Sequence, residues 1–271
     1  MKKISRRRFL RNGLLAGLGL GLLDAAWLEG FFVELNRHDL RPAGQEAELR
    51  ILQISDLHLK PLGWKHQRLL RSIRRAQPDE IAITGDAIDA ADQLELLDRF
   101  LGQLPMDTPV VAILGNWEYW GEVDLEALSD TYARHGGQLR INQHRQYTFS
   151  GRKVGITGID DFVGGSADYA TAIRDYQAVD FHLVLTHCPV HCDWIERERG
   201  PERIDLILAG HTHGGQITLL GYAPYCPPGS GTYVRGWYRE RGLPLSVSKG
   251  VGTSVFPLRF GSRAEVGLFR V

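Results

Sequence analysis

The chain has 271 residues, which is enough for one large domain or two small ones with a complete hydrophobic core. Its 32 Lys and Arg residues balance its 32 Asp and Glu residues, so the formal net charge is zero. General nucleic-acid-binding proteins normally have a basic excess, and we therefore expect no nucleic-acid partner. The hydrophobic share of 43% and the 31 glycines are typical of a globular chain with many tight turns.

Residues 1–35 form a segment of their own. The basic stretch SRRRFLR at residues 5–11 is followed by an apolar stretch at residues 13–23. That stretch is shorter than the roughly 20 residues of a spanning helix, so the pattern is typical of an export signal. It resembles the twin-arginine signal, with Arg6 and Arg7 as the pair, and an ordinary positively flanked membrane anchor is the alternative. The first interpretation predicts export to the periplasmic or outer face of the inner membrane.

The end of this segment bears on membrane association. No clean small-residue cleavage site follows residue 23, so we expect the exported chain to remain membrane-associated. Apolar side chains then recur at helical spacing: Trp27, Leu28, Phe31, Phe32 and Leu35. Such a face either lies in a membrane interface or packs against the domain, and both alternatives stay open. Residues 36–48, which include Pro42-Ala43-Gly44, are predicted to be a linker.

Residues 49–271 are predicted to form an α/β domain. Amphipathic stretches predict helices at 64–77, 92–104 and 124–135. Short apolar runs predict strands at 49–55, 80–84, 110–114, 153–159, 182–186, 205–209, 245–248 and 264–270. The alternation of strands and helices indicates an α/β class, and the closely spaced later strands favour a second sheet packed on the first.

Polar side chains follow five of these strands. They are Asp56, His58, Asp86, Asn116, His187, His211 and His213. An Asp or Asn at such a position is more often a turn former or helix cap, and a lone His is usually a loop residue. Five strand ends that all carry oxygen or imidazole donors are hard to assign to turns alone, because ligands in α/β folds gather at those ends. The mixture suits borderline divalent ions such as Mn, Fe or Zn.

In chain order these blocks read D-x-H, GD, GN, H and G-H-x-H. This arrangement resembles the calcineurin-like metallophosphoesterase superfamily over most of residues 49–271. The resemblance implies a two-sheet β-sandwich flanked by α-helices, with two divalent metal ions. It implies that one ion is held by Asp56, His58, Asp86 and His213. It implies that the second is held by Asp86, Asn116, His187 and His211, with Asp86 shared.

The chemistry of such a site can be argued separately. Two neighbouring ions can share a bridging hydroxide, since the pKa of a bound water can fall toward ~7. That hydroxide, held by Asp86 through the ions, is expected to attack phosphorus in line. The family motif carries a His after GN, whereas this chain has Trp117 there, followed by Glu118. We therefore expect Trp117 to be a wall of the site. No other histidine can be given the missing role from sequence, the candidates being His66, His135, His144 and His191.

The segments GHTHGGQ, KGVGTSVFPLRF and ELNRH resemble a bacterial, membrane-associated branch of the superfamily. That branch includes phosphodiesterases and enzymes similar to UDP-2,3-diacylglucosamine diphosphatase of lipid A biosynthesis. The resemblance implies a hydrolase that cleaves a phosphodiester or diphosphate bond, with a membrane lipid as substrate and a membrane surface as partner. The alternative is a catalytically silent metal-binding protein at a membrane surface.

Two further patterns leave alternatives open. The helix predicted at 64–77 places Lys65, Arg68 and Arg75 on one face, either as a solvated surface or as a basic collar for an anionic lipid head group. Leu69, Ile73 and Ala76 lie on another face. Cys188 and Cys192 flank His191, which suggests a separate structural zinc site, but no second Cys pair completes a four-ligand set.

Overall fold

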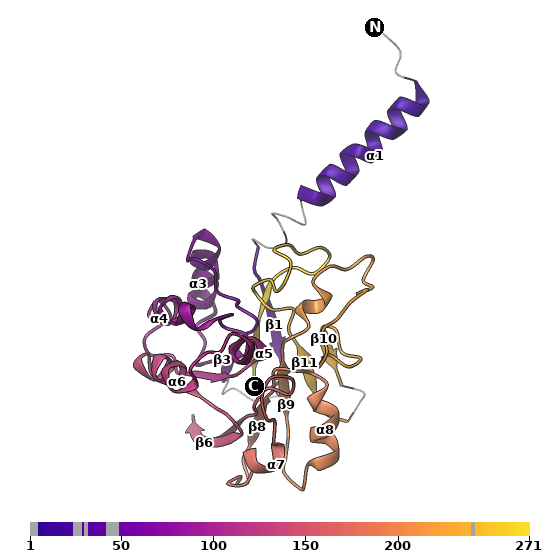
Figure 1. Cartoon of the computed structure of the whole chain (residues 1–271). Coiled ribbons are helices and arrows are strands. Elements are labelled where there is room, and N and C mark those ends of the chain that lie inside the picture. The colour runs from indigo at the N-terminus through magenta and orange to yellow at the C-terminus, as the bar shows by residue number, and fades with distance from the viewer. Residues whose placement is uncertain (1–4, 24–28, 30–31, 42–48, 240–241) are drawn as a thin grey trace.

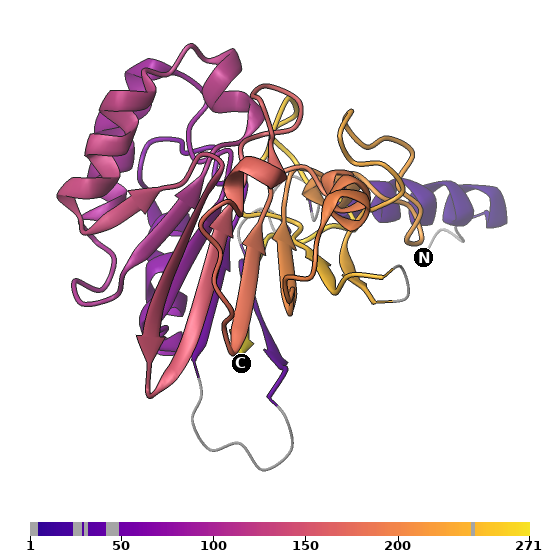
Figure 2. The same ribbon diagram turned by 90° about the horizontal axis from the view of Figure 1, so that it is seen from below.

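The computed structural model describes residues 5–23, 29, 32–41, 49–239 and 242–271. Two six-stranded mixed sheets pack on each other, and helices cover the outer face of each (Figures 1 and 2). The helix α1 (Arg6–Leu23) stands apart from these layers (Figure 1). The expected two-sheet α/β sandwich flanked by helices is confirmed.

The first sheet has the strand order β1-β12-β2-β3-β4-β5. Its strands are β1 (Glu34–Asp39), β12 (Glu265–Arg270), β2 (Arg50–Ile54), β3 (Glu80–Thr84), β4 (Val110–Ile113) and β5 (Gly137–Leu139). β2, β3, β4 and β5 pair in parallel, and β12 is antiparallel to β2. The carboxyl ends of the three central parallel strands therefore meet at one edge of the sheet.

The second sheet has the order β10-β11-β9-β8-β7-β6. Its strands are β10 (Gly236–Tyr238), β11 (Leu245–Val247), β9 (Leu206–Ala209), β8 (Phe181–Leu185), β7 (Arg152–Gly158) and β6 (Gln143–Phe149). β7, β8, β9 and β11 run in parallel, while the edge strands β6 and β10 are antiparallel to their neighbours. The sheets thus present similar rows of parallel strand ends.

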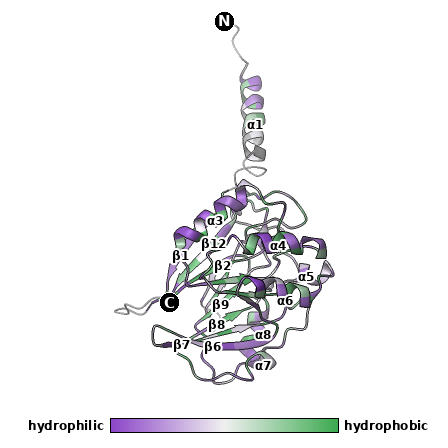
Figure 3. Cartoon of the chain, turned by 90° about the vertical axis from the view of Figure 1, so that its left-hand side faces the viewer, coloured by the Kyte–Doolittle hydropathy of each residue, from purple (hydrophilic) through white to green (hydrophobic). Residues whose placement is uncertain are grey.

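Helices of two groups flank the sheets. In chain order they are α3 (Trp64–Ala76), η2 (Ala91–Gln93), α4 (Leu94–Leu101), α5 (Asn116–Trp120), α6 (Leu125–Arg134), α7 (Tyr169–Ala172), α8 (His191–Glu198) and η3 (His213–Gly215). The helices α3, α4 and α6 contribute to the same hydrophobic cluster as the first sheet, and α7 and α8 to that of the second. Figure 3 shows the interior strands as hydrophobic and much of α3 as hydrophilic.

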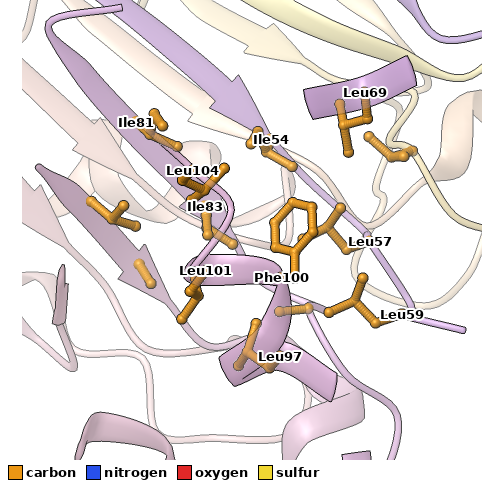
Figure 4. Packing of buried hydrophobic residues seen from close by; sticks show 14 of the residues in the cluster. Ile54, Leu57, Leu59, Leu69, Ile81, Ile83, Leu97, Phe100, Leu101 and Leu104 are labelled. Carbon is orange, nitrogen blue, oxygen red and sulfur yellow. The ribbon is translucent and has the colours of Figure 1, made fainter. Parts of the chain in front are cut away.

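The period-two alternation of the strands divides the core into layers. In β2, Ile51 belongs to the cluster between the sheets, whereas Leu52 and Ile54 belong to the cluster under α3, α4 and α6. Figure 4 shows Phe100 in the cluster under α3, α4 and α6, close to Leu57. Both faces of the central strands are buried, which explains why their sequences are almost continuously apolar.

Some elements differ from the sequence-based expectation. The strands β1, β5, β6 and β10 were not predicted, because edge strands with one exposed side lack a clear apolar pattern. Residues 36–39, predicted to begin a linker, belong to β1, which pairs with β12. Leu35 also lies in β1 and therefore not on a helical stripe. Trp27, Leu28, Phe31 and residues 42–48 lie outside the described residues. Within the described part of the chain, no helix has both the length and the apolarity needed to span a bilayer.

Candidate dinuclear metal centre

The predicted ligands lie where the strands of both sheets end. Asp56 and His58 follow β2, Asp86 follows β3, and Asn116 opens α5 after β4. His187 follows β8, and His211 and His213 follow β9. The first sheet therefore supplies four of these side chains and the second sheet three, so the centre lies on the seam between the two sheets.

Six of the seven side chains form two groups that share Asp86. Ligand atoms of Asp56, His58, Asp86 and His213 all lie within 4.8 Å of one another, and so do those of Asp86, His187 and His211. Asp86 Oδ2 is 3.1 Å from His187 Nε2 and 3.6 Å from His58 Nε2. The carboxylate of Asp86 thus lies between the two groups.

Buried polar atoms without a partner indicate whether these residues fit metal ions. Asp56 Oδ2 and Asn116 Oδ1 are buried and have no hydrogen-bond partner. Buried polar atoms are nearly always hydrogen-bonded, so two such unpaired oxygens beside the imidazoles indicate a bound ligand. Carboxylate, amide and imidazole donors suit borderline divalent cations. The residues therefore fit two such ions, and Asn116 would add its amide oxygen to the group of Asp86, His187 and His211.

Hydrogen bonds outside the two groups fix which imidazole nitrogen faces inward. His58 Nδ1 donates to Asp89 Oδ1 at 2.5 Å, and His187 Nδ1 donates to the Thr84 carbonyl at 2.8 Å. Each bond turns Nε2 toward another predicted ligand, to His213 Nε2 (3.1 Å) for His58 and to Asp86 Oδ2 (3.1 Å) for His187. Metal-binding histidines are oriented by an outer partner in the same way. His211 instead donates Nε2–H to the Pro228 carbonyl at 2.6 Å, which leaves its Nδ1 free.

The electrostatics of the groups suit cation binding. Burial alone would raise the pKa of Asp86, but the charge and hydrogen bond of His187 outweigh it and hold the pKa at about 2. Burial lowers the pKa of His187, yet the charge of Asp86 raises it well above its usual value. The pKa of His213 is well below its usual value because of burial and the neighbouring His58 and Arg259. The proton shared by Asp86 and His187 is therefore one that a bound cation would displace.

The backbone at the centre is held in an unusual conformation. Left-handed φ values occur at five predicted ligands: Asp56 (50°), His58 (40°), Asp86 (52°), His211 (71°) and His213 (51°). For residues other than glycine this conformation costs about 1–2 kcal/mol each, and such strain clusters at functional sites. Neighbouring glycines permit the close packing, since a Cβ at Gly115 would lie 2.3 Å from Asp86 Oδ1.

Glu118 holds two ligand loops together. This buried carboxylate accepts hydrogen bonds from the backbone N–H groups of Asp86 (3.1 Å), Ala87 (2.6 Å) and Gly115 (2.9 Å). Burial and the charge of Asp86 raise its pKa to about 7. The loop after β3 and the loop after β4 are therefore joined through one side chain, and Glu118 positions Asp86 and Asn116.

Arg259 is a buried positioning residue that sequence reasoning missed. Its guanidinium donates to the carbonyls of Gly252 and Ser262, and Nη2 lies 3.3 Å from His213 Nδ1. Ser262 Oγ donates to the His213 carbonyl at 2.7 Å. These contacts hold the left-handed backbone of His213. Nothing in the pattern of its segment, KGVGTSVFPLRF, marks this arginine as buried.

The centre opens into a pocket of about 540 Å³, within the usual range for small-molecule sites. Most of its other lining is apolar: Trp117, Trp120, Ile217, Pro224, Tyr225, Pro227, Pro228, Val255 and Phe256. The Trp117 ring lies edge-on to His58 with 5.7 Å between ring centroids, and its backbone N–H donates to Asp86 Oδ1 at 2.9 Å. Trp117 therefore forms a wall of the site.

The four histidines considered as candidates for the missing role have local structural partners. His66 accepts from the Gly63 N–H, His135 contacts Asp98, His144 contacts Thr157, and His191 contacts Thr186. None of these four lines the pocket. Among the described residues, the imidazoles that line it are those of His211 and His213, both predicted ligands.

The cysteines show no second metal site in the described part of the chain. Cys188 Sγ donates to Asp161 Oδ1 at 3.2 Å, and Cys192 belongs to α8 and packs in the hydrophobic cluster of the second sheet. Neither candidate metal group found among the described residues includes a cysteine. The structural zinc alternative therefore has no ligand set here.

The charged face of α3 does not line the pocket. Lys65 donates to the Val251 carbonyl at 2.9 Å, and its pKa is lowered to about 8 by burial and by the charge of Arg259. Arg68 lies over the Phe32 ring, and Arg75 is exposed. Leu69, Ile73 and Ala76, placed on another face by the sequence, are buried. The charged face of α3 therefore forms no collar around the pocket, and of its three cations only Arg75 is exposed.

A two-sheet α/β sandwich with a shared-carboxylate metal centre at its strand ends defines a class of metal-dependent hydrolases. The family model for calcineurin-like phosphoesterases matches residues 49–215, and the chain belongs to this family. It is a metal-dependent phosphoester hydrolase.

Two bacterial relatives agree with this assignment. The uncharacterized metallophosphoesterase YkuE of Bacillus subtilis is 30% identical, over 99% of this chain and 98% of its own length. YkoQ of the same organism is also an uncharacterized metallophosphoesterase and is 30% identical, over 88% of each chain. Among solved structures, the 5'-nucleotidase precursor of Thermus thermophilus aligns with a TM-score of 0.47 at 15% identity, over 76% of this chain and 49% of that one.

Proposed function

We propose that this phosphoesterase hydrolyses a phosphodiester or diphosphate bond of a membrane lipid, with a UDP-linked lipid such as UDP-2,3-diacylglucosamine as the best candidate. The observation that carries the proposal is the apolar lining of the pocket beside the metal centre. A water-soluble sugar phosphate would leave that surface without contacts. A substrate with an acyl chain or a nucleobase would cover it, which favours a lipid diphosphate.

The chain's own residues prepare the reaction. Two divalent ions bound here would neutralise charge on the phosphoryl oxygens and acidify a water molecule. Asp86 contributes to both ligand groups and so fixes their separation. Glu118 and Arg259 hold the ligand loops from outside, which keeps the groups preorganised. Trp117 and the apolar lining exclude bulk water from the reacting bond.

The function is tested with full-length protein loaded with manganese and assayed on bis-p-nitrophenyl phosphate. We expect metal-dependent turnover that is lost on chelation and restored by the metal. A screen of lipid and nucleotide phosphates then identifies the preferred class, and lipid diphosphates should rank first. Absence of turnover on every phosphate ester, with both ions bound, would instead establish the alternative of a silent metal-binding protein.

Trp117 leads to a prediction about leaving groups. We propose that it stands where the family has a proton-donating histidine, so the enzyme should favour groups that leave without protonation. A phosphate monoester has a second pKa near ~6 and leaves ionised, whereas an alkoxide needs a proton. General-acid help is worth about 10²–10⁴-fold. Trp117→His should therefore speed hydrolysis of alkyl phosphodiesters within that range while changing the rate on a diphosphate little.

The measurement compares wild type and Trp117→His on p-nitrophenyl, diphosphate and alkyl diester substrates. Metal content of both proteins is the control, because the Trp117 backbone N–H contacts Asp86. Equal wild-type rates on the three classes would show that another group supplies the proton. The same conclusion follows if the histidine variant improves none of them.

We further propose export by the twin-arginine route and retention at the membrane. The Arg6–Arg7 pair at the start of α1 supports this, because it matches the arginine pair of the twin-arginine signal. That pathway carries folded proteins, which suits an enzyme that is loaded with metal before export. Replacing both with lysine should keep the protein in the cytoplasm, as measured by cell fractionation. Arg11→Lys is the matched control and should leave export intact. Unchanged periplasmic and membrane fractions for the pair variant would contradict the route, and wild type found wholly in soluble fractions would contradict retention.

A further inference from the structure

Two loops beside the pocket expose a cluster of large apolar side chains. The first loop carries Leu219, Leu220 and Tyr222, and the second carries Val255 and Phe256. We call these five residues the apolar rim. Leu219 is 66% exposed, Phe256 is 60% exposed, and Leu220 is completely exposed. Exposed apolar side chains gathered on loops at a functional pocket are typical of a docking surface.

The first loop is a tight turn with an unusual residue at its corner. Leu219 and Tyr222 exchange two backbone hydrogen bonds of 2.9 Å each, and the corner residues Leu220 and Gly221 have φ values of 50° and 87°. Turns of this kind favour Asn or Asp followed by Gly, because a left-handed conformation disfavours leucine. Leu220 therefore adopts a left-handed conformation that leucine disfavours, and its side chain is fully exposed to solvent.

The rim is built onto the metal centre. Arg235 donates to the Gly221 carbonyl at 3.2 Å and to the Gly214 carbonyl at 3.0 Å, which ties the turn to the loop of His213. Gln216 donates to the Phe256 carbonyl at 2.8 Å and accepts from the Ser254 N–H, which ties the second loop to the same segment. The rim therefore has a fixed position relative to the pocket.

The N-terminal segment reaches the domain beside the rim. The Ser262 N–H donates to the Glu29 carboxylate at 3.0 Å, and the Ala264 N–H donates to the Glu29 carbonyl. Five residues lie between Leu23, at the end of α1, and Glu29, and the six residue steps from one to the other span at most about 22 Å. α1 carries four arginines near its start and exposes Phe9, Leu10, Leu14 and Leu15. Basic and apolar side chains on one helix match an anionic lipid surface.

We propose that the apolar rim inserts into an anionic phospholipid bilayer and turns the mouth of the metal pocket toward the lipid. This inference rests on the membrane-lipid substrate proposed above and adds the surface through which that substrate enters. Leucine and valine side chains would lie among acyl chains, and the tyrosine hydroxyl and the pocket mouth would lie at the head-group level. A lipid phosphate could then reach the metal centre without leaving the bilayer completely.

The test places a fluorescent label on the rim. Full-length Cys226→Ser protein receives Leu220→Cys and is labelled with an environment-sensitive nitrobenzoxadiazole group. Cys188 and Cys192 are buried and should stay unlabelled. The matched control is Met106→Cys, since Met106 is 95% exposed and lies before β4, at the strand end opposite the metal centre. Both proteins are mixed with vesicles of equimolar phosphatidylcholine and phosphatidylglycerol.

The label at residue 220 should shift to the blue and become protected from iodide quenching, while the label at residue 106 should not change. A label that stays in water while the protein sediments with the vesicles would overturn the proposal, because α1 alone would then make the contact. Failure to bind vesicles would also overturn it. A signal at residue 220 that grows with protein concentration in the absence of lipid would assign the rim to a second copy of the chain.

Turnover of bis-p-nitrophenyl phosphate by the same labelled proteins separates this inference from the proposed function. Leu220 does not line the pocket, so both labelled proteins should hydrolyse the soluble substrate at the wild-type rate. Normal turnover without a lipid response would contradict insertion of the apolar rim into the bilayer and would leave the phosphoesterase activity supported. As a second variant, Leu219→Asp with Leu220→Asp should weaken vesicle binding about tenfold or more, with soluble turnover unchanged.

Discussion

Asp86→Ala is expected to lower the hydrolysis of bis-p-nitrophenyl phosphate by about 10³-fold or more and to release bound metal from both positions. Losing a single electrostatic contact in a preorganised site costs about 10²–10³-fold, and Asp86 contributes to both ligand groups. Its removal also leaves His58 and His187 facing one another without the carboxylate between them. Both ions should therefore be affected by this one substitution.

Metal content by elemental analysis and turnover with added manganese check this prediction. Asp107→Ala is the matched control, because Asp107 is an exposed carboxylate in the loop before β4. That variant should keep two ions per chain and the wild-type rate. Two ions and normal turnover in Asp86→Ala would mean that the assignment of the shared ligand is wrong.

Glu118→Ala is expected to lower the free energy of unfolding by about 3–5 kcal/mol, although Glu118 belongs to neither ligand group. The reason is that the substitution leaves buried N–H groups of Asp86, Ala87 and Gly115 without an acceptor. Urea unfolding in the presence of a chelator measures the effect, so that loss of metal does not contribute. Glu118→Gln keeps one acceptor oxygen and should be affected less.

Glu126→Ala is the control for this experiment, since Glu126 is an exposed carboxylate at the start of α6. It should unfold at nearly the wild-type urea concentration. If Glu118→Ala and Glu126→Ala have the same unfolding midpoint, water or neighbouring groups replace the carboxylate, and Glu118 does not hold the loops together.

The sequence predicts the central strands well because their two buried faces make continuous apolar runs, such as EIAIT at β3. The polar residues directly after such runs then indicate where the site lies. β1 was missed because its sequence ELNRHD is polar and its partner β12 lies more than 220 residues later in the chain. Pairing over such a distance leaves no local signal.

Arg259 and the apolar rim were missed for a different reason. An arginine in a loop is normally exposed, and only the tertiary structure surrounds Arg259 with backbone carbonyls near His213. Leu219 and Leu220 have the composition of a core segment, and only the turn between them and Tyr222 reveals that they are exposed. Burial and exposure of single residues in loops depend on packing that the local pattern does not contain.

Because the metal centre lies on the seam between the sheets, we expect metal supply to affect the abundance of the protein as well as its activity. Ions that bind the folded chain and not the unfolded one add about 4 kcal/mol to stability when the free ion is present at a thousand times its dissociation constant. The ions would link the two sheets, because their ligands follow β2, β3 and β4 in the first sheet and β8 and β9 in the second. They would also oppose the relaxation of the five left-handed ligand residues. In a metal-starved cell the chain would lose both ions and the stability that they add between the two sheets. Its proteolytic turnover should therefore rise as its activity falls.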